Sequence, residues 1–230
     1  MAGEDDSITI VIPAYNEEIR IRETILRYSE EFPDQEIIVV CDGVDNTKKL
    51  VGEVAGERPN IHLLEFHRRL GKGGAIVKGL KAAKGDMVGF VDADESVNPE
   101  DIRGMFKALN DVDAVIASRR LKESKILKQQ PIVRRTASKI FNIAIRAVFD
   151  LPFRDTQCGA KVFKGQAIRD ILGDLETDGF EIDVEILWRL KKKGYKVIEY
   201  PIKWRHSEDS KFKLSHSIDM MHSLLRVRLK

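Results

Sequence analysis

Short apolar runs separated by longer mixed segments dominate the first half of the chain. Runs without polar alternation occur at 8–12, 36–40, 61–66, 87–91 and 113–117. Such runs are typical of strands that are buried on both faces of a parallel sheet. The segments between them have the length of helices, and alternating strands and helices predict right-handed βαβ units. We therefore expect an α/β fold, with a mostly parallel sheet flanked by helices.

Polar residues follow four successive strands of this predicted sheet. They are Asn16 and Glu17 after the first strand, Asp42 after the second, the Gly71–Gly74 loop after the third, and Asp92 and Asp94 after the fourth. Ligands bind outside the carboxyl ends of the strands in sheets of this kind. An acidic turn would explain one such end, but four aligned ends favour a functional site.

Two of these groups suggest a chemistry. Asp92 and Asp94 are two residues apart, so in extended geometry both carboxylates face one crevice. Carboxylate oxygens suit Mg²⁺ or Mn²⁺, with substrate phosphates completing the coordination. Gly71-Lys72-Gly73-Gly74 precedes a predicted helix, where backbone N–H groups and Lys72 suit a phosphate. The loop matches neither the Walker A pattern nor the dinucleotide fingerprint.

Composition excludes several classes of protein. The 230 residues are 43% hydrophobic and 33% charged, as in an ordinary globular protein, and the net charge of +2 argues against a nucleic-acid binder. Cys41 and Cys158 lie far apart, which favours a reduced, cytoplasmic protein with free thiols. No apolar run reaches 18 residues and the N-terminus is acidic, so neither a transmembrane helix nor a signal peptide is expected.

Residues 119–146 concentrate positive charge, and the pattern becomes helical from Pro131. Polar residues recur every four positions in one stripe, at Arg134, Ser138, Asn142 and Arg146. Apolar residues cover the rest of this helix. The pattern fits an amphipathic helix at a membrane interface, a core helix with a solvated basic stripe, or a dimer contact. Residues 214–229 form a second candidate for membrane-surface or core packing.

Several motifs together resemble a known family. Pro13-Ala14-Tyr15-Asn16-Glu17, Asp42-Gly43, Gly71-Lys72-Gly73 and Asp92-Ala93-Asp94, in this order, resemble the inverting family 2 glycosyltransferases of the GT-A fold. The segments 155–159, 161–163, 180–187, 201–204 and 210–211 are similar to polyprenyl-phosphate sugar synthases. They resemble the dolichyl-phosphate glucose synthase branch more than the mannose branch, and the resemblance spans residues 8–228.

The resemblance implies roles for matching residues. The residues implied to bind the nucleotide are Pro13, Ala14, Tyr15, Glu17, Asp42, Lys72 and Asp92. Those implied to bind the metal are Asp92 and Asp94. The acceptor phosphate falls to Arg119, Arg134, Ser138 and Lys211, with Arg120 as an alternative to Arg119, and the sugar to Asp183. Asp94, Arg119 and Arg134 are the implied catalytic residues. Two positions depart from the family pattern, because Ser96 replaces a Gln near the metal and Cys41 replaces the first Asp of Asp-Asp-Gly-Ser.

The implied organisation is one GT-A domain over 1–230, with a nucleotide-sugar half at 8–117, a basic interface segment at 118–150 and an acceptor half at 151–230. The implied reaction moves a hexose, from UDP-glucose or next from GDP-mannose, to dolichyl or polyprenyl phosphate. Mg²⁺ or Mn²⁺ would assist, with the protein peripheral on the inner face of the membrane. A homodimer and a separate membrane-anchor subunit stay open. The alternatives are a soluble family 2 enzyme with a sugar acceptor and a side-chain base, and a sugar nucleotidyltransferase.

Overall fold

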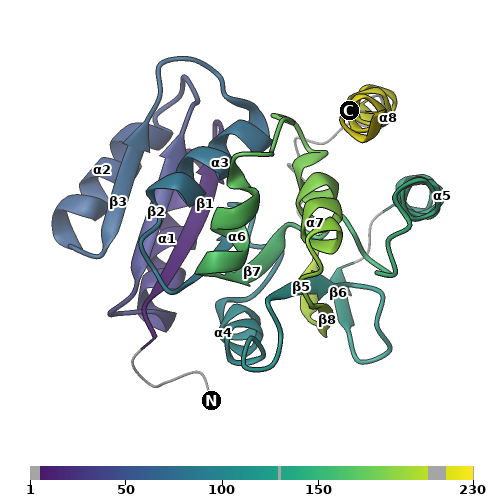
Figure 1. Cartoon of the computed structure of the whole chain (residues 1–230). Coiled ribbons are helices and arrows are strands. Elements are labelled where there is room, and N and C mark those ends of the chain that lie inside the picture. The colour runs from purple at the N-terminus through teal and green to yellow at the C-terminus, as the bar shows by residue number, and fades with distance from the viewer. Residues whose placement is uncertain (1–5, 129–130, 207–215, 230) are drawn as a thin grey trace.

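A central sheet organises the protein. The structure is a computed structural model that describes residues 6–128, 131–206 and 216–229, except for the side chains of residues 133, 134 and 216–218. Within these residues one seven-stranded sheet forms (Figure 1), from β1 (Ile8–Ala14), β2 (Glu36–Cys41), β3 (Ile61–Glu65), β4 (Met87–Val91), β5 (Ala114–Ser118), β7 (Ala160–Lys164) and β8 (Val197–Pro201). A small second sheet pairs β6 (Lys125–Lys128) with β9 (Lys203–Arg205).

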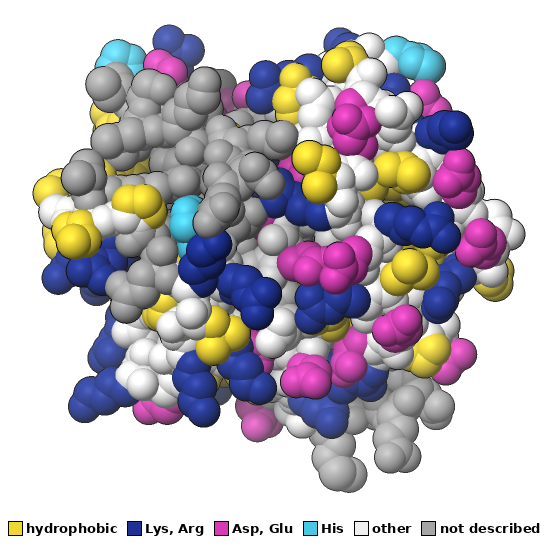
Figure 2. All heavy atoms as spheres, turned by 180° about the vertical axis from the view of Figure 1, so that it is seen from behind, with side chains coloured by type: hydrophobic (Ala, Val, Ile, Leu, Met, Phe, Trp, Pro, Cys, Tyr) yellow, Lys and Arg dark blue, Asp and Glu magenta, His cyan; other side chains and the backbone are white. Residues whose placement is uncertain are grey.

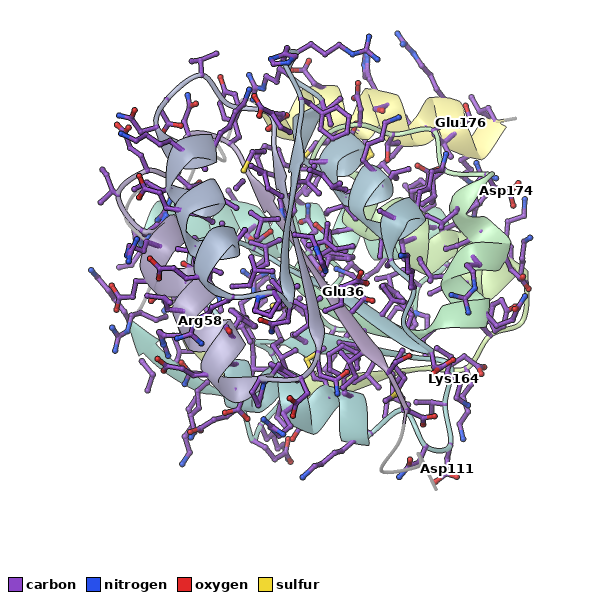
Figure 3. All side chains as sticks on the ribbon, turned by 90° about the vertical axis from the view of Figure 1, so that its left-hand side faces the viewer. Glu36, Arg58, Asp111, Lys164, Asp174 and Glu176 are labelled. Carbon is purple, nitrogen blue, oxygen red and sulfur yellow. The ribbon has the colours of Figure 1, made fainter. Side chains whose placement is uncertain are left out.

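Helices cover both faces of the sheet. They are α1 (Ile21–Glu31), α2 (Thr47–Glu57), α3 (Gly71–Ala82), α4 (Pro99–Lys107), α5 (Ile132–Phe149), α6 (Gly165–Leu172), α7 (Ile182–Lys192) and α8 (His216–Leu229). Alternate strand residues enter different cores, so that Ile10 and Ile12 pack with α1, α2 and α4 while Val11 packs with α3, α6 and α7. Figure 3 shows the sheet between these two helical layers. A third apolar cluster joins α5, α7 and α8.

The directions of the strands determine which segments of the chain meet at the carboxyl edge of the sheet. The strand order is β3-β2-β1-β4-β7-β5-β8, and β1 runs parallel to β2 and β4. β7 runs antiparallel to both β4 and β5, with Ala160 opposite Val91. The chain that precedes β7 therefore arrives at the carboxyl edge of the sheet, beside Asp92.

The predicted α/β architecture is confirmed. The ends of each predicted strand agree with those of an observed strand to within two residues. Continuous apolar runs are a strong local signal for buried strands. β6, β7, β8 and β9 were not predicted.

Helix α5 presents some of its apolar residues outward, although Ile145 and Phe149 are buried. Ile132, Ile140 and Ile143 are 71%, 64% and 53% exposed, and their spacing puts them on one helical face. The opposite face carries buried Asn142, whose Nδ2 donates to Arg154 O at 2.9 Å and whose Oδ1 accepts from Thr156 Oγ1 at 2.9 Å. The alternative of a core helix with a solvated basic stripe is therefore wrong at Asn142, which is buried, although Ile145 and Phe149 do pack in a core. Among the described residues no helix is long and apolar enough to span a membrane.

Close packing of α3 on β1 gives a stability test. A Cβ at Gly79 would lie 2.2 Å from Val11 Cγ1, whereas a Cβ at Gly52 in exposed α2 meets nothing within 4 Å. We expect Gly79→Ala to lower the free energy of unfolding by about 1–3 kcal/mol through overpacking. The control Gly52→Ala should raise it by roughly 0.5–1 kcal/mol, because alanine favours the helix. Urea unfolding measures both, and equal effects would contradict this packing.

Candidate active site

The loops after β1 and β2 lock together. Asn16 has a φ of 53°, and its Oδ1 accepts from Val44 N at 2.9 Å. Gly43 is required beside it, because a Cβ there would lie 2.5 Å from that oxygen. The hydroxyl of Thr47, at the start of α2, accepts from Glu17 N at 2.7 Å. The two loops therefore form one rigid wall of the pocket.

The loop before α3 joins this wall. Asp42 Oδ2 accepts a hydrogen bond from Leu70 N at 2.7 Å, which ties the end of β2 to the start of α3. The Arg69 guanidinium lies 4.3 Å from the centroid of the Tyr15 ring, a cation–π contact. Arg20 Nε donates to Glu17 Oε2 at 2.5 Å. Aromatic, acidic and basic groups thus line the region where the nucleotide is predicted.

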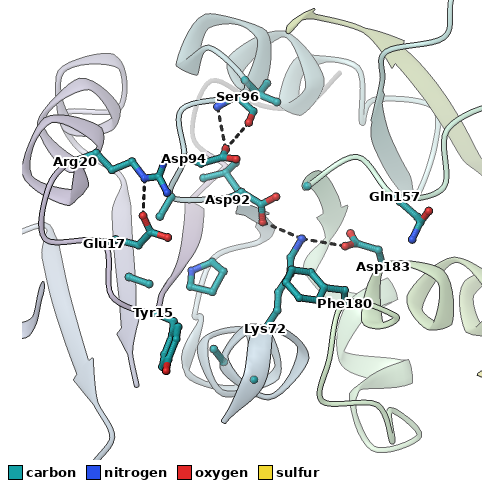
Figure 4. A pocket seen from close by; sticks show the side chains of 18 of the residues that line it. Tyr15, Glu17, Arg20, Lys72, Asp92, Asp94, Ser96, Gln157, Phe180 and Asp183 are labelled. Carbon is teal, nitrogen blue, oxygen red and sulfur yellow. Dashed lines mark hydrogen bonds and ion pairs between the residues drawn. The ribbon is translucent and has the colours of Figure 1, made fainter. Parts of the chain in front are cut away.

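Asp92 and Asp94 both line the same pocket (Figure 4). Asp94 Oδ1 accepts from Ser96 N at 3.0 Å and from Ser96 Oγ at 2.5 Å, so Ser96 orients this carboxylate. Asp92 Oδ1 lies 2.9 Å from Lys72 Nζ, and Asp92 N donates to Gly159 O at 2.9 Å. Burial raises the pKa of Asp92 to about 6, with Asp94 and Asp183 adding to the effect and Lys72 opposing it. The pocket therefore concentrates negative charge at this point.

Helix α1 holds the turn that carries these carboxylates. Glu95 has a φ of 55°, in the left-handed region that favours glycine. Arg27 Nη1 donates to Glu95 Oε2 at 2.9 Å, and Thr24 Oγ1 donates to Ala93 O at 3.1 Å. These contacts stabilise an otherwise unfavourable backbone next to Asp94.

A chain of charged residues continues from Asp92 to the acceptor half. Lys72 Nζ also contacts Asp183 Oδ2 at 3.0 Å, and the buried Lys161 donates to Asp183 Oδ1. Burial alone would raise the pKa of Asp183, but Lys161 and Lys72 outweigh it and hold that pKa below its ordinary value. Asp183 is therefore an ionised carboxylate whose two oxygens each bind a lysine.

Arg119 also lines the pocket. Its Nε and Nη2 donate to the two oxygens of buried Asp155 at 2.7 and 2.8 Å, and its guanidinium lies 5.4 Å from the Trp204 ring centroid. Burial opposes ionisation of Asp155, yet Arg119 prevails and lowers its pKa to about 2. Arg120 Nη2 instead donates to Ser138 O at 3.4 Å. Of the two arginines, Arg119 lines the pocket.

The pocket brings most of the predicted site residues together. Those that line it are Pro13, Ala14, Tyr15, Glu17, Asp42, Lys72, Asp92, Asp94, Arg119, Ser138 and Asp183. Lys211 and the side chain of Arg134 lie outside what the structure describes. Sequence reasoning assigned no role to Arg20, Arg69, Phe141 or His206, which also line the pocket. For two of them a signal existed, since Arg20 is three residues from Glu17 and His206 alternates with Trp204 along a strand.

The residues present fit a divalent cation that a substrate also ligates. Nowhere in the described parts of the chain do three or more His, Cys, Asp or Glu side chains gather in a metal-binding arrangement. The protein would therefore supply the carboxylates of Asp92 and Asp94, while Ser96 is already bound to Asp94. Magnesium commonly uses one or two carboxylates together with substrate phosphates.

Comparison with known proteins assigns the family. Residues 9–172 match the model of the family described as glycosyl transferase family 2. The chain belongs to this family. It is a glycosyltransferase, and it is similar to the dolichyl-phosphate beta-glucosyltransferase of Dictyostelium discoideum, at 29% identity over 97% of this chain and 74% of that protein. A protein with this activity in its name from Trichomonas vaginalis is 34% identical over 96% of this chain and 72% of its own length. The predicted resemblance to dolichyl-phosphate glucose synthases is thus confirmed.

A solved structure of another enzyme has the same fold as this chain. Glucosyl-3-phosphoglycerate synthase from Mycobacterium tuberculosis, in complex with Mn²⁺ and uridine-diphosphate-glucose, has a TM-score of 0.70 at 18% identity. The match covers 98% of this chain and 78% of that one. The predicted GT-A architecture is confirmed by this similarity.

Gly159 gives a test of the site geometry. A Cβ at this position would lie 1.7 Å from Asp92 Oδ2, so Gly159→Ala must displace the Asp92 carboxylate. A misplacement of about 1 Å can cost roughly 100-fold in rate. We expect kcat/KM for transfer, followed as release of nucleoside diphosphate, to fall by about that factor. Gly173→Ala is the control, because a Cβ there meets nothing within 4 Å. Full activity of Gly159→Ala would contradict the role of Asp92.

Proposed function

We propose that this glycosyltransferase moves a hexose, glucose in preference to mannose, from a nucleotide sugar to dolichyl or polyprenyl phosphate at a membrane surface. The observation that carries the proposal is that one pocket combines Asp92, Asp94 and Lys72 with Arg119 and Ser138 of the basic interface segment. Relatives that match nearly the whole of this chain, over about three quarters of their own length, are named for this activity. The fold neighbour that holds Mn²⁺ and UDP-glucose supports the choice of metal and donor.

The donor would lie along the loops after β1, β2 and β3. Tyr15 and Asp42 would contact the base and ribose, and Lys72 the diphosphate. Asp92 and Asp94 would hold Mg²⁺ or Mn²⁺, which as a Lewis acid stabilises the charge of the leaving diphosphate. Ser96 and Glu95 keep Asp94 oriented for this task through the contacts described above.

The chemistry of the acceptor favours a phosphate. A sugar hydroxyl needs a base, but both oxygens of Asp183 bind lysines and its pKa is lowered. Buried Glu185 accepts from Thr177 N and Thr177 Oγ1 instead of facing the pocket. A phosphate is already anionic at neutral pH and attacks without losing a proton. Its oxygen forms the bond to the anomeric carbon while the bond from that carbon to the diphosphate breaks, which inverts the configuration.

Arg119 and Ser138 would receive the acceptor phosphate. Asp155 holds the guanidinium of Arg119 rigidly through two hydrogen bonds, so its remaining N–H groups are preorganised. Asp183 would then contact sugar hydroxyls next to the Lys72 ammonium. Arg134 and Lys211 are further proposed contacts of the phosphate.

The outer face of α5 supports a membrane location. Ile132, Ile140 and Ile143 are exposed on this face, near the exposed basic side chains of Arg135 and Lys139. Exposed apolar and basic residues continue on β6, where Leu127 lies between residues such as Lys125 and Lys128. Figure 2 shows apolar and basic side chains gathered at the edge of the molecule where Figure 1 places α5. Isoleucines in acyl chains and lysines at anionic headgroups match this pattern. Two buried free cysteines agree with the cytoplasmic face.

The first test concerns the reaction. Purified protein with Mn²⁺ and detergent-dispersed polyprenyl phosphate should transfer tritiated glucose from UDP-glucose into an organic-soluble product. We expect Asp94→Asn to lower kcat/KM by about 100-fold or more, because it removes a charge that holds the metal. Asp111→Asn, at an exposed turn far from the pocket (Figure 3), is the control.

Other products would redirect the proposal. Transfer from GDP-mannose alone would change the donor, and transfer to a water-soluble sugar alone would favour the soluble enzyme. Release of inorganic pyrophosphate from UTP and a sugar phosphate would indicate a nucleotidyltransferase.

A second test concerns the membrane. Replacing Ile132, Ile140 and Ile143 by Ser should weaken binding to vesicles containing anionic lipid by at least about tenfold, since burying one such side chain is worth roughly 1.5–3 kcal/mol. Val44→Ser is the control, because Val44 is 90% exposed and precedes α2 by three residues. Figure 1 shows α2 at the opposite end of the sheet from α5. Co-sedimentation measures the binding. Unchanged binding of the triple variant would exclude α5 as the contact.

A further inference from the structure

The Lys72 ammonium bridges two carboxylates that belong to different parts of the fold. Its Nζ lies 2.9 Å from Asp92 Oδ1 and 3.0 Å from Asp183 Oδ2, as the dashed lines of Figure 4 show. Asp92 follows β4, Asp183 lies in the first turn of α7, and Lys72 lies in the first turn of α3. One side chain thus connects a proposed metal ligand to the acceptor half.

The two ends of this bridge differ in rigidity. Asp183 is buried, and its other oxygen accepts from Lys161, which is itself fully buried near the start of β7 and donates to Cys158 O at 2.9 Å. Asp92 faces the open pocket, and about a third of its side chain is exposed. A lysine side chain has several rotatable bonds, so Lys72 can keep Asp183 while releasing Asp92.

The release of Asp92 by Lys72 changes the charge that a metal ion would meet at this carboxylate. Asp92, Asp94 and Asp183 carry three negative charges, which Lys72 and Lys161 reduce to one. A divalent cation at Asp92 competes with the Lys72 ammonium for the same carboxylate and is repelled by it. The diphosphate of a nucleotide brings new negative charge that both cations can share.

We propose that Lys72 makes metal binding conditional on the nucleotide. It weakens the binding of a divalent cation alone by occupying Asp92, and it stabilises the cation together with a nucleoside diphosphate by turning toward the phosphates while Asp183 retains it. This inference rests on the proposed metal site at Asp92 and Asp94. Because coupling between two ligands is reciprocal, the cation and the nucleotide strengthen each other's binding by the same factor.

The experiment measures Mn²⁺ binding directly, by electron paramagnetic resonance at pH 7.5, with and without UDP and with correction for the Mn²⁺–UDP complex in solution. The variant Lys72→Gln keeps hydrogen bonding to both carboxylates and removes the charge, and Lys72→Met removes both. We expect each variant to bind Mn²⁺ alone about tenfold more tightly than the wild type, within the usual 5- to 150-fold range of such couplings. The factor by which UDP tightens Mn²⁺ binding should fall by a similar amount.

Controls separate this inference from the function on which it rests. Lys78→Met removes an exposed lysine from the same helix and should behave as the wild type. Melting temperatures verify that each variant is folded. If Lys72→Met does not fold, the result for Lys72→Gln decides. If UDP tightens Mn²⁺ binding to the wild type but Lys72→Gln binds Mn²⁺ alone no more tightly, only the role of Lys72 is overturned. If the wild type binds no Mn²⁺ even with UDP, or if Asp94→Asn binds it equally well, the metal site fails and this inference with it.

Discussion

The antiparallel orientation of β7 decides which side chains meet at the carboxyl edge of the sheet. Because β7 runs against β4 and β5, the residues that precede it arrive where those two strands end. Asp155 thereby reaches Arg119, and Gly159 reaches Asp92. Within the strand, Lys161 contacts Asp183. A parallel strand in this place would instead deliver the residues that follow it, so both sides of the pocket depend on this one reversal.

Buried ion pairs fix the geometry of the pocket more than they stabilise the fold. Asp155 and Lys161 are almost wholly shielded from water, and each has a charged partner within hydrogen-bond distance. Such pairs add little net stability, because desolvation offsets their attraction, yet losing one partner costs about 3–5 kcal/mol. Their consequence here is orientation. Arg119 is held against Asp155 and Asp183 against two lysines, so the positions of both side chains in the pocket are fixed.

Sequence patterns predicted the strands and loops whose structure is determined by residues close together in the sequence. The buried runs gave β1 to β5, and the polar residues at their ends gave the donor side of the pocket. β7 escaped prediction because Lys161, its second residue, is charged where the pattern of a buried strand requires an apolar residue. That lysine is buried only because Cys158 O and Asp183 bind its ammonium. Lys72 and Asp183 are 111 residues apart, so their contact is a property of the assembled fold.

Helix α5 shows how a buried hydrogen bond can set the character of an exposed surface. The helical period predicted a polar stripe and an apolar remainder, but not which of them faces the protein. Asn142 settles the direction, since its amide bonds Arg154 O and Thr156 inside the fold. With Asn142 turned inward, the helix places Ile140 and Ile143 outside. Ser138, from the inward side of the same helix, lines the pocket. One helix thus separates a polar site from an apolar surface, the same division as in a molecule with a phosphate head and a hydrocarbon tail.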